Sequence, residues 1–390
     1  MSEDFLLLNP GPVPLAEPVL EVMREPMVSH RSASFEADYE RAQAGVRYVF
    51  ETSSIDGSAT AADGTPLLLM GTATLGMEAA VANLVSPGDT VMPIVNGKFG
   101  RRFRRIAEKY ATVKPVEFDW GDSVAVDVVA ESIDNDVDLV AMVHNETSTG
   151  LLNPVSAIGE LAADHGANFV VDGVTSIGGD VFKIDDWGVD IAITDAQKAL
   201  ATPPGISAVY VAAGVEAELD GAHAPFYADL PRHVRKARDH QTPFTSAVPL
   251  VRAMAVSMDR IRDEGMPDRI ARHRRQARAF RAAFDAMGLE RFPDVRGESR
   301  VSNTVTAISL PESIKDEPDA FFDAVAARNV SISGGQAHLG GEIFRVSTMG
   351  ELTNEHVLRG ARTVGEALDS VGFAVDTDEA VSAAERELSS

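Results

Sequence analysis

The 390-residue sequence contains no cysteine. Disulfides, thiolate metal sites and a cysteine nucleophile are therefore excluded. No apolar run is long enough to cross a bilayer. The opening Met-Ser-Glu-Asp is acidic and precedes only a short apolar run, which argues against a secretory signal peptide. We therefore expect a cytoplasmic protein without a metal centre.

Positive charge is also scarce. The 35 lysine and arginine residues stand against 59 acids, giving a formal net charge of −24, and only 7 of the bases are lysines. Such a charge repels nucleic acid and anionic membranes, so neither is expected as a partner. It resembles the acidic composition of proteins from salt-loving (halophilic) organisms, where screening weakens the self-repulsion. The apolar fraction of 45% is that of an ordinary globular protein.

The stretch 168–204 contains the main candidate catalytic residues of the chain. Its apolar runs Phe169–Val171 and Val189–Thr194 predict buried parallel strands. Asp172 ends the first strand and Lys198 closely follows the second, so both would face the crevice where α/β sheets bind ligands. An apolar setting lowers a lysine's pKa, as a Schiff-base lysine requires, and the acid could pair with a pyridinium nitrogen. The alternative is an exposed lysine and a turn-capping aspartate.

A second stretch predicts an anion site. Leu67–Met70 is a buried strand, Gly71-Thr72-Ala73-Thr74 forms a turn, and apolar residues then recur at helical spacing. Free N–H groups and the helix dipole converge at such a turn. Neither the dinucleotide glycine pattern nor a P-loop lysine is present. A phosphate monoester therefore fits best, held by the backbone and hydroxyls of Thr72, Ala73 and Thr74.

Alternation of strands and helices continues from residue 67 to 211 and predicts a doubly wound, mostly parallel sheet. Beyond Gly265 the order of elements predicts a smaller α+β domain. The further predicted strands are Val91–Val95, Leu139–Val143, Ile206–Val211, Thr304–Leu310 and Phe344–Ser347. The predicted helices include Leu15–Met27, Phe35–Phe50, Val155–His165, Pro267–Met287 and Glu317–Arg328.

Several motifs together resemble a known family. They are Asp172-Gly-Val-Thr-Ser-Ile-Gly-Gly, Asp-Trp-Gly-Val-Asp, Gln197-Lys198-Ala-Leu, Pro203-Pro204-Gly205, Ile332-Ser-Gly-Gly335, Gly341–Gly350 and Ser29-His30-Arg31-Ser32. From about Leu8 to about Gly372 the chain resembles the class V, fold-type I pyridoxal phosphate (PLP) aminotransferases. Within that family it is most similar to the alanine–glyoxylate and serine–pyruvate branch.

The resemblance implies an α/β fold with a large PLP-binding domain, residues 21–262, whose mostly parallel seven-stranded sheet is flanked by helices. A smaller C-terminal α+β domain would span 263–373. An N-terminal arm, 1–20, would cross to the partner of a homodimer and line the substrate site at Gly11. The acidic tail 374–390 is expected to be a frayed helix, and the polar segment Glu51–Pro66 a surface insertion of unknown role.

The resemblance also implies site roles. Lys198 would hold PLP and move the proton, while Asp172 would keep the ring nitrogen protonated. The other implied cofactor contacts are Phe99 stacked on the ring, Thr147, Val174 and Gln197, the phosphate cup Thr72, Ala73 and Thr74, and across the dimer Thr242 or, in reserve, Thr245. Arg345 would clamp the substrate carboxylate, with a structural ion pair as the alternative. His30 is expected to pack or cap, not to catalyse.

The expected reaction is transfer of an amino group from alanine or serine to glyoxylate or pyruvate, by a ping-pong mechanism. A cysteine desulfurase is excluded because the chain lacks the cysteine that would carry the persulfide. A PLP-dependent lyase or decarboxylase would use the same lysine, aspartate and arginine and stays open, as does a non-catalytic scaffold. A nicotinamide dehydrogenase is the weakest rival, because its glycine fingerprint is missing.

Overall fold

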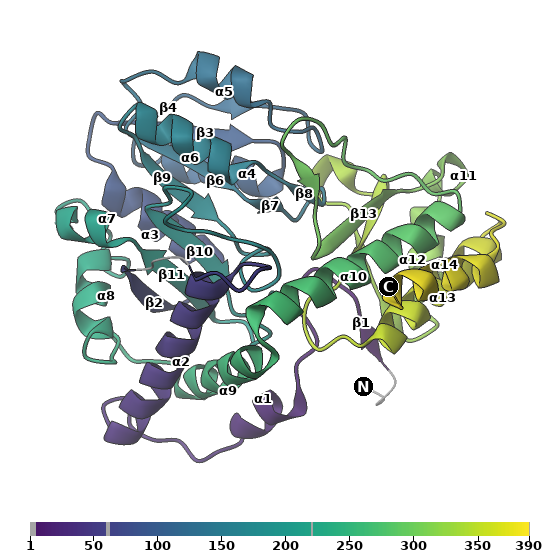
Figure 1. The fold of residues 1–390 in the computed structure, drawn as a ribbon, viewed down its shortest axis with the longest axis horizontal. Helices are drawn as coiled ribbons and strands as arrows, with labels where there is room; N and C mark the ends of the chain where they lie inside the picture. Colours follow the sequence, from purple (N-terminus) through teal and green to yellow (C-terminus); the bar gives the residue numbers. More distant parts are fainter. Residues whose placement is uncertain (1–4, 60–62, 220, 390) are drawn as a thin grey trace.

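The computed structural model describes residues 5–59, 63–219 and 221–389. Its centre is an eight-stranded sheet with the order β2-β11-β10-β9-β6-β3-β4, in which β5 also pairs with β3 (Figure 1). The strands are β2 Thr65–Met70, β11 Ile206–Val211, β10 Ile191–Asp195, β9 Asn168–Asp172, β6 Leu139–Val143, β3 Thr90–Val95, β4 Thr112–Val113 and β5 Val116–Glu117.

The sheet is mostly parallel, as predicted. Strand β11 runs antiparallel to both β10 and β2, and the pairings from β10 to the β4 edge are parallel. The predicted seven strands correspond to the seven positions along the sheet. The eighth arises because the edge position is split into β4 and β5, on either side of Pro115, whose missing N–H cannot join a ladder.

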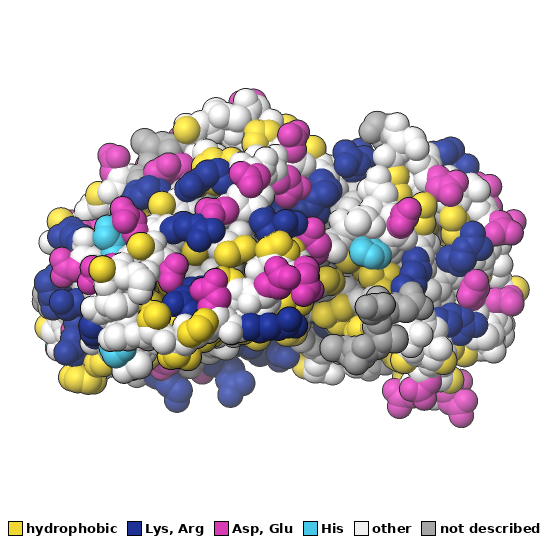
Figure 2. Space-filling view, turned by 90° about the horizontal axis from the view of Figure 1, so that it is seen from below, with side chains coloured by type: hydrophobic (Ala, Val, Ile, Leu, Met, Phe, Trp, Pro, Cys, Tyr) yellow, Lys and Arg dark blue, Asp and Glu magenta, His cyan; other side chains and the backbone are white. Residues whose placement is uncertain are grey.

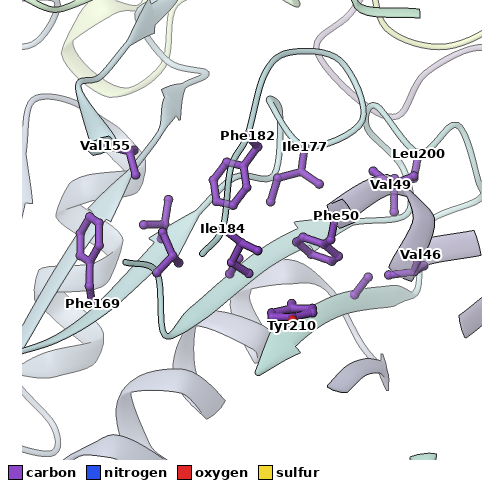
Figure 3. Close-up of a cluster of buried hydrophobic side chains, with 14 of the residues drawn as sticks. Val46, Val49, Phe50, Val155, Phe169, Ile177, Phe182, Ile184, Leu200 and Tyr210 are labelled. Carbon is purple, nitrogen blue, oxygen red and sulfur yellow. The ribbon is translucent and has the colours of Figure 1, made fainter. Parts of the chain in front are cut away.

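Helices cover both faces of the sheet and bury its apolar side chains. On one face lie α3 Ala73–Leu84, α4 Lys98–Ala107, α7 Ala213–Glu218 and α8 Leu230–Ala237. On the other lie α2 Ala33–Thr52, α5 Val126–Ser132, α6 Val155–Asp164 and α9 Val248–Glu264. Figure 3 shows part of this second core, where Phe50 of α2 faces Tyr210 of β11 and Leu200 lies beside Val49. Leu200 thereby anchors the loop that carries Lys198.

The smaller domain has its own apolar core beside the large domain, and the two form separate lobes in Figure 2. Its antiparallel sheet has the order β13-β16-β15, with β13 Val305–Ser309, β16 Ile343–Ser347 and β15 Ser333–Gly334. Its helices are α10 Met266–Ala286, α11 Glu312–Lys315, α12 Pro318–Ala326, α13 Asn354–Ser370 and the 3-10 turn Ala337–Leu339. Strands β7 Asn145–Glu146, β8 Leu151–Leu152 and β12 Arg300–Val301 join the two domains in a small sheet.

The C-terminal tail differs from the prediction. The tail is not a frayed helix, because α14, Thr377–Leu388, packs on α10 and buries Ala380 and Ala384 in the small-domain core. In the arm, β1, Leu6–Leu7, pairs with β14, Val330–Ser331, of the same chain. The predicted acidic opening, residues 1–4, lies outside the described residues.

Three predicted boundaries also change. Helix α1 covers only Glu17–Val22 of the predicted Leu15–Met27. Helix α2 and strand β2 reach into both ends of the predicted insertion 51–66, of which residues 60–62 lie outside the described residues. Among the described residues, no helix combines the length and apolar character needed to cross a membrane.

Candidate active site

A cavity of about 240 Å³ lies at the carboxyl ends of the parallel strands, where α/β sheets bind ligands. Strands β9 and β10 lead Asp172 and Lys198 to it, and the N-termini of α3 and α4 close one side. Its lining residues are Thr72, Ala73, Thr74, Phe99, Arg102, Thr147, Asp172, Val174, Asp195, Gln197 and Lys198. The structure thus brings together every predicted cofactor contact except Thr242 and Thr245.

Lys198 is held on a short loop after β10. Burial lowers the pKa of Lys198 to about 8, partly opposed by the negative charge of Asp195. A substantial fraction of this amine is therefore neutral near pH 8, the form that attacks a carbonyl. Arg269 of α10 fixes the loop from outside the cavity, because its guanidinium donates to the carbonyls of Ala199 at 2.6 Å and Gly178 at 2.8 Å.

The N-terminal arm lies directly against this lysine in the same chain. The Lys198 ammonium donates to the Pro10 carbonyl. Gly11 has a φ of +109°, and a Cβ added there would lie 2.5 Å from Lys198 Nζ. Only glycine allows the arm to pass so close, so the arm narrows the space above the lysine. The predicted nearness of Gly11 to the site therefore arises within one chain.

Asp172 is buried at the end of β9. Its Oδ1 accepts a hydrogen bond from the Val174 N–H at 2.9 Å. Burial raises the pKa of Asp172 to about 7, and the charge of Glu146 acts in the same direction. A carboxyl of this kind gains most from a cationic N–H placed beside it, since that charge favours the ionised form.

The predicted phosphate cup is the N-terminus of α3, with Thr72 as the N-cap residue. Thr74 Oγ1 accepts from the Arg102 guanidinium at 2.9 Å, so a fixed cation stands beside the free N–H groups of the first helical turn. The Ala73 N–H already donates to Asp195 Oδ2 at 3.1 Å, as does the Gln197 amide at 3.2 Å.

Phe99 is oriented by a buried carboxylate that the sequence analysis did not consider. Glu146 Oε2 accepts from the Phe99 and Gly100 N–H groups at 3.0 and 3.1 Å, which caps the start of α4. The Arg102 guanidinium carbon lies 4.8 Å from the Phe99 ring centroid. The ring therefore has a fixed position at the cavity wall.

Arg345 is buried in β16, and its guanidinium donates to backbone oxygens only. The acceptors are Gly334 O, at 3.1 and 2.8 Å, and Thr147 O, at 2.8 Å. Among the residues that the structure describes, no carboxylate lies within ion-pair distance of Arg345, so the alternative of a structural ion pair is not found. Burial lowers the pKa of Arg345 to about 10, which leaves the group cationic at neutral pH.

Thr242 and Thr245 do not reach the cavity of their own chain. The Thr242 hydroxyl is buried against Phe244 O, at 2.8 Å, and Ser246, whereas Thr245 is exposed. The Ser29–Ser32 motif acts on this loop through Arg31, which donates to Gln241 Oε1 at 2.7 Å and to Thr242 O at 2.8 Å. His30 is not part of the lining.

Two lining residues, Arg102 and Asp195, were missed by the sequence analysis. Arg102 lies three positions after Phe99 at the start of a helix, so helical spacing alone places both on one face. Asp195 ends β10, one residue beyond the predicted strand end at Thr194. Extending the strand by one residue would have placed this acid at the carboxyl edge of the sheet.

These features fit pyridoxal phosphate: a buried amine of lowered pKa, a buried carboxyl opposite it, and a helix N-terminus in one cavity. Together with the fold they define a PLP-dependent transferase of fold type I. The chain belongs to the class V aminotransferases, since the family model described as "Aminotransferase class-V" matches residues 7–306.

Relatives match over nearly the whole chain. An uncharacterized aminotransferase of Methanocaldococcus jannaschii is 36% identical, covering 95% of this chain and 94% of its own. A serine–glyoxylate aminotransferase of Arabidopsis thaliana is 32% identical, with 97% and 94% covered. The crystal structure of an alanine–glyoxylate aminotransferase from Nostoc sp. matches with a TM-score of 0.82 at 29% identity, covering 94% of this chain and 96% of that one.

Proposed function

We propose that this aminotransferase moves the amino group of a small amino acid, alanine or serine, to a 2-oxo acid, glyoxylate or pyruvate. One observation carries the proposal: Arg345, a buried guanidinium without a carboxylate partner among the described residues, stands beside the Thr147 wall of the cavity that holds Lys198 and Asp172. An α-carboxylate satisfies such a group bidentately. The names of the serine–glyoxylate and alanine–glyoxylate relatives support the choice of substrates.

Each side chain has a distinct task in this proposal. Bound PLP supplies the aldehyde that captures the amino acid and a cationic ring that accepts the electron pair left at the α-carbon. Asp172 keeps the ring nitrogen protonated, and Phe99 covers the ring face. Arg345 binds the carboxylate and so orients the α-carbon. Lys198 would hold the cofactor, and its freed Nζ would take the proton from the α-carbon and deliver it to the carbon that was the cofactor's aldehyde carbon.

A panel of donors tests this assignment. Purified holoenzyme is mixed with alanine, serine, aspartate or glycine, against glyoxylate or pyruvate, and both the 2-oxo acid and the amino acid product are quantified. We expect stoichiometric 2-oxo acid from alanine or serine and glycine or alanine from the acceptor. Release of CO₂, or of a 2-oxo acid with ammonia and no amino acid formed from the acceptor, would instead identify the lyase or decarboxylase alternative. A colourless protein that does not take up PLP would identify the scaffold.

Arg345→Met should raise the KM for the amino donor with a smaller change in kcat. Truncating one partner of a buried charge pair costs about 2–5 kcal/mol, so kcat/KM should fall about 30-fold or more. Arg281→Met is the matched control, because Arg281 is also buried and its guanidinium donates to a backbone carbonyl, Ser302 O at 2.9 Å. An unchanged KM in Arg345→Met, or an equal rise in Arg281→Met, would contradict the clamp.

We also propose a homodimer in which the loop at 242–245 reaches the partner's phosphate cup. Exposed apolar side chains support it, chiefly Phe226, 75% exposed, and Met27, 68% exposed. Sedimentation velocity should give about twice the chain mass of 41.6 kDa.

Because Thr245 is exposed and the Thr242 hydroxyl is bonded within its own loop, Thr245→Ala should weaken PLP binding more than Thr242→Ala. The cytoplasmic location stays a prediction.

A further inference from the structure

An acid occupies the phosphate cup. Asp195 is 2% exposed and lines the cavity together with Thr72, Ala73 and Thr74. Its Oδ2 accepts from the Ala73 N–H, one of the donors that the start of α3 offers to a phosphate, and from the Gln197 amide. Its Oδ1 is buried and has no hydrogen-bond partner in the part of the chain that the structure describes. The cup therefore already contains one carboxylate, with one oxygen unsatisfied.

The groups around Asp195 do not neutralise it fully. Lys198, from the loop after β10, is the cation that most favours its charged form, and Asp172 of β9 is a second acid that interacts with it. Arg102 of α4 lines the same cavity but donates to Thr74. From β11, the facing residue is the uncharged Ser207, and from α3 only backbone and threonine hydroxyls face the cup. Burial raises the pKa of Asp195 to about 6.

We propose that Asp195 takes up a proton when the cofactor's phosphate enters the cup and then donates its O–H to a phosphate oxygen, so that phosphate capture strengthens as pH falls. The proposal rests on the PLP assignment. A carboxylate and a phosphate dianion sharing one helix N-terminus repel each other in a buried setting, whereas one proton turns the repulsion into a hydrogen bond. The proton comes from solvent, and the Oδ1 without a partner is the oxygen free to carry it.

The pH dependence has a definite sign. Free Asp195 is mostly ionised above pH 6, so binding must add a proton there. Affinity for the phosphate group therefore rises as pH falls from 8 towards 6 and levels off below that, where Asp195 is already protonated. Titration of the phosphate monoester itself changes the affinity in the opposite direction, since the monoester loses its second negative charge as pH falls through about 6. The two contributions are thus separable by their direction.

The test compares pyridoxamine 5′-phosphate with pyridoxamine, which differ only in the phosphate and cannot form a covalent bond to Lys198. The ratio of their dissociation constants, measured by fluorescence titration from pH 8 to 6, gives the contribution of the phosphate cup to binding. In the wild type we expect the preference for the phosphorylated form to grow about tenfold or more, since one proton is taken up over two pH units. In Asp195→Asn the preference for the phosphorylated form should stay constant or decrease as pH falls. At pH 8 this preference should be larger in Asp195→Asn than in the wild type.

Asp190→Asn is the matched control. Asp190 also has a pKa raised by burial to about 6 and also accepts a backbone N–H, that of Phe169 at 2.7 Å, but it lies at the opposite end of β10. It should keep the wild-type pH profile. An identical profile in the wild type and Asp195→Asn, or the same flattening in Asp190→Asn, would overturn the proposal.

A second measurement needs no variant. Calorimetry in buffers of different ionisation enthalpy counts the protons taken up on binding. At pH 7, where Lys198 with its pKa of about 8 already carries its proton, the wild type should take up about one more proton with pyridoxamine 5′-phosphate than with pyridoxamine. Equal proton uptake for the two ligands would refute the role of Asp195. If PLP were not the cofactor, neither ligand would bind, which separates the two failures.

Discussion

Lys198→Ala is expected to remove the long-wavelength absorbance of covalently held PLP and to lower kcat by at least about 10²–10⁴-fold, the usual worth of a positioned acid–base group. The reason is that, in the proposed reaction, Nζ both carries the cofactor and moves the α-proton. Absorbance spectra of the reconstituted protein and single-turnover rates with alanine check both parts. Added methylamine should restore some turnover, because a free amine can accept the proton that Nζ no longer takes.

Lys183→Ala is the control for Lys198, since Lys183 is a partly exposed lysine whose ammonium lies 3.3 Å from Asp186 on the surface. It should keep the wild-type spectrum and rate. If Lys198→Ala retained the absorbance band and full turnover, the assignment of the active site would be wrong. Folding of each variant is followed by thermal unfolding, and Lys198→Ala should not be less stable, because the buried ammonium is disfavoured by desolvation.

Asp172→Asn should separate binding from chemistry. The amide keeps the shape of the side chain but cannot carry the negative charge that holds a ring nitrogen protonated. We expect PLP to remain bound through Lys198 and the cup, while kcat falls by about 10²–10³-fold, as when one preorganised electrostatic partner is lost. Spectral titration with PLP and stopped-flow measurement of the α-proton step give the two numbers.

Asp190→Asn again serves as the comparison, because it removes a carboxyl from the amino end of the neighbouring strand, away from the cavity. It should leave kcat close to that of the wild type, because Asp190 is not among the residues that line the cavity. A rate for Asp172→Asn close to that of Asp190→Asn would show that the ring nitrogen does not depend on this carboxyl.

Much of the fold could be predicted because its signals are local. Apolar runs such as Leu139–Val143 and Ile206–Val211 match β6 and β11, since fully buried strands require uninterrupted apolar residues. The edge strands β4 and β5 were not predicted, because their two-residue segments on either side of Pro115 form no apolar run. The prediction of a frayed helix at 374–390 was wrong because the packing of this segment is not a local signal. Its alanines look surface-like in sequence, and only their packing on α10 makes them core.

Within the site, the sequence alone predicted which strand ends reach the cavity: Asp172 at the end of β9, Lys198 after β10 and the threonine turn before α3. Tertiary structure decided which neighbours those groups meet. Three contacts join segments that are distant in the chain. The Pro10 carbonyl lies on Lys198, the Glu146 carboxylate lies at the start of α4, and Asp195 lies in the predicted phosphate cup. Spacing along a sequence fixes the face of a helix or strand on which a residue lies. Its contacts and its desolvation depend on which other segments cover it, and so do the pKa values of about 6, 7 and 8 for Asp195, Asp172 and Lys198.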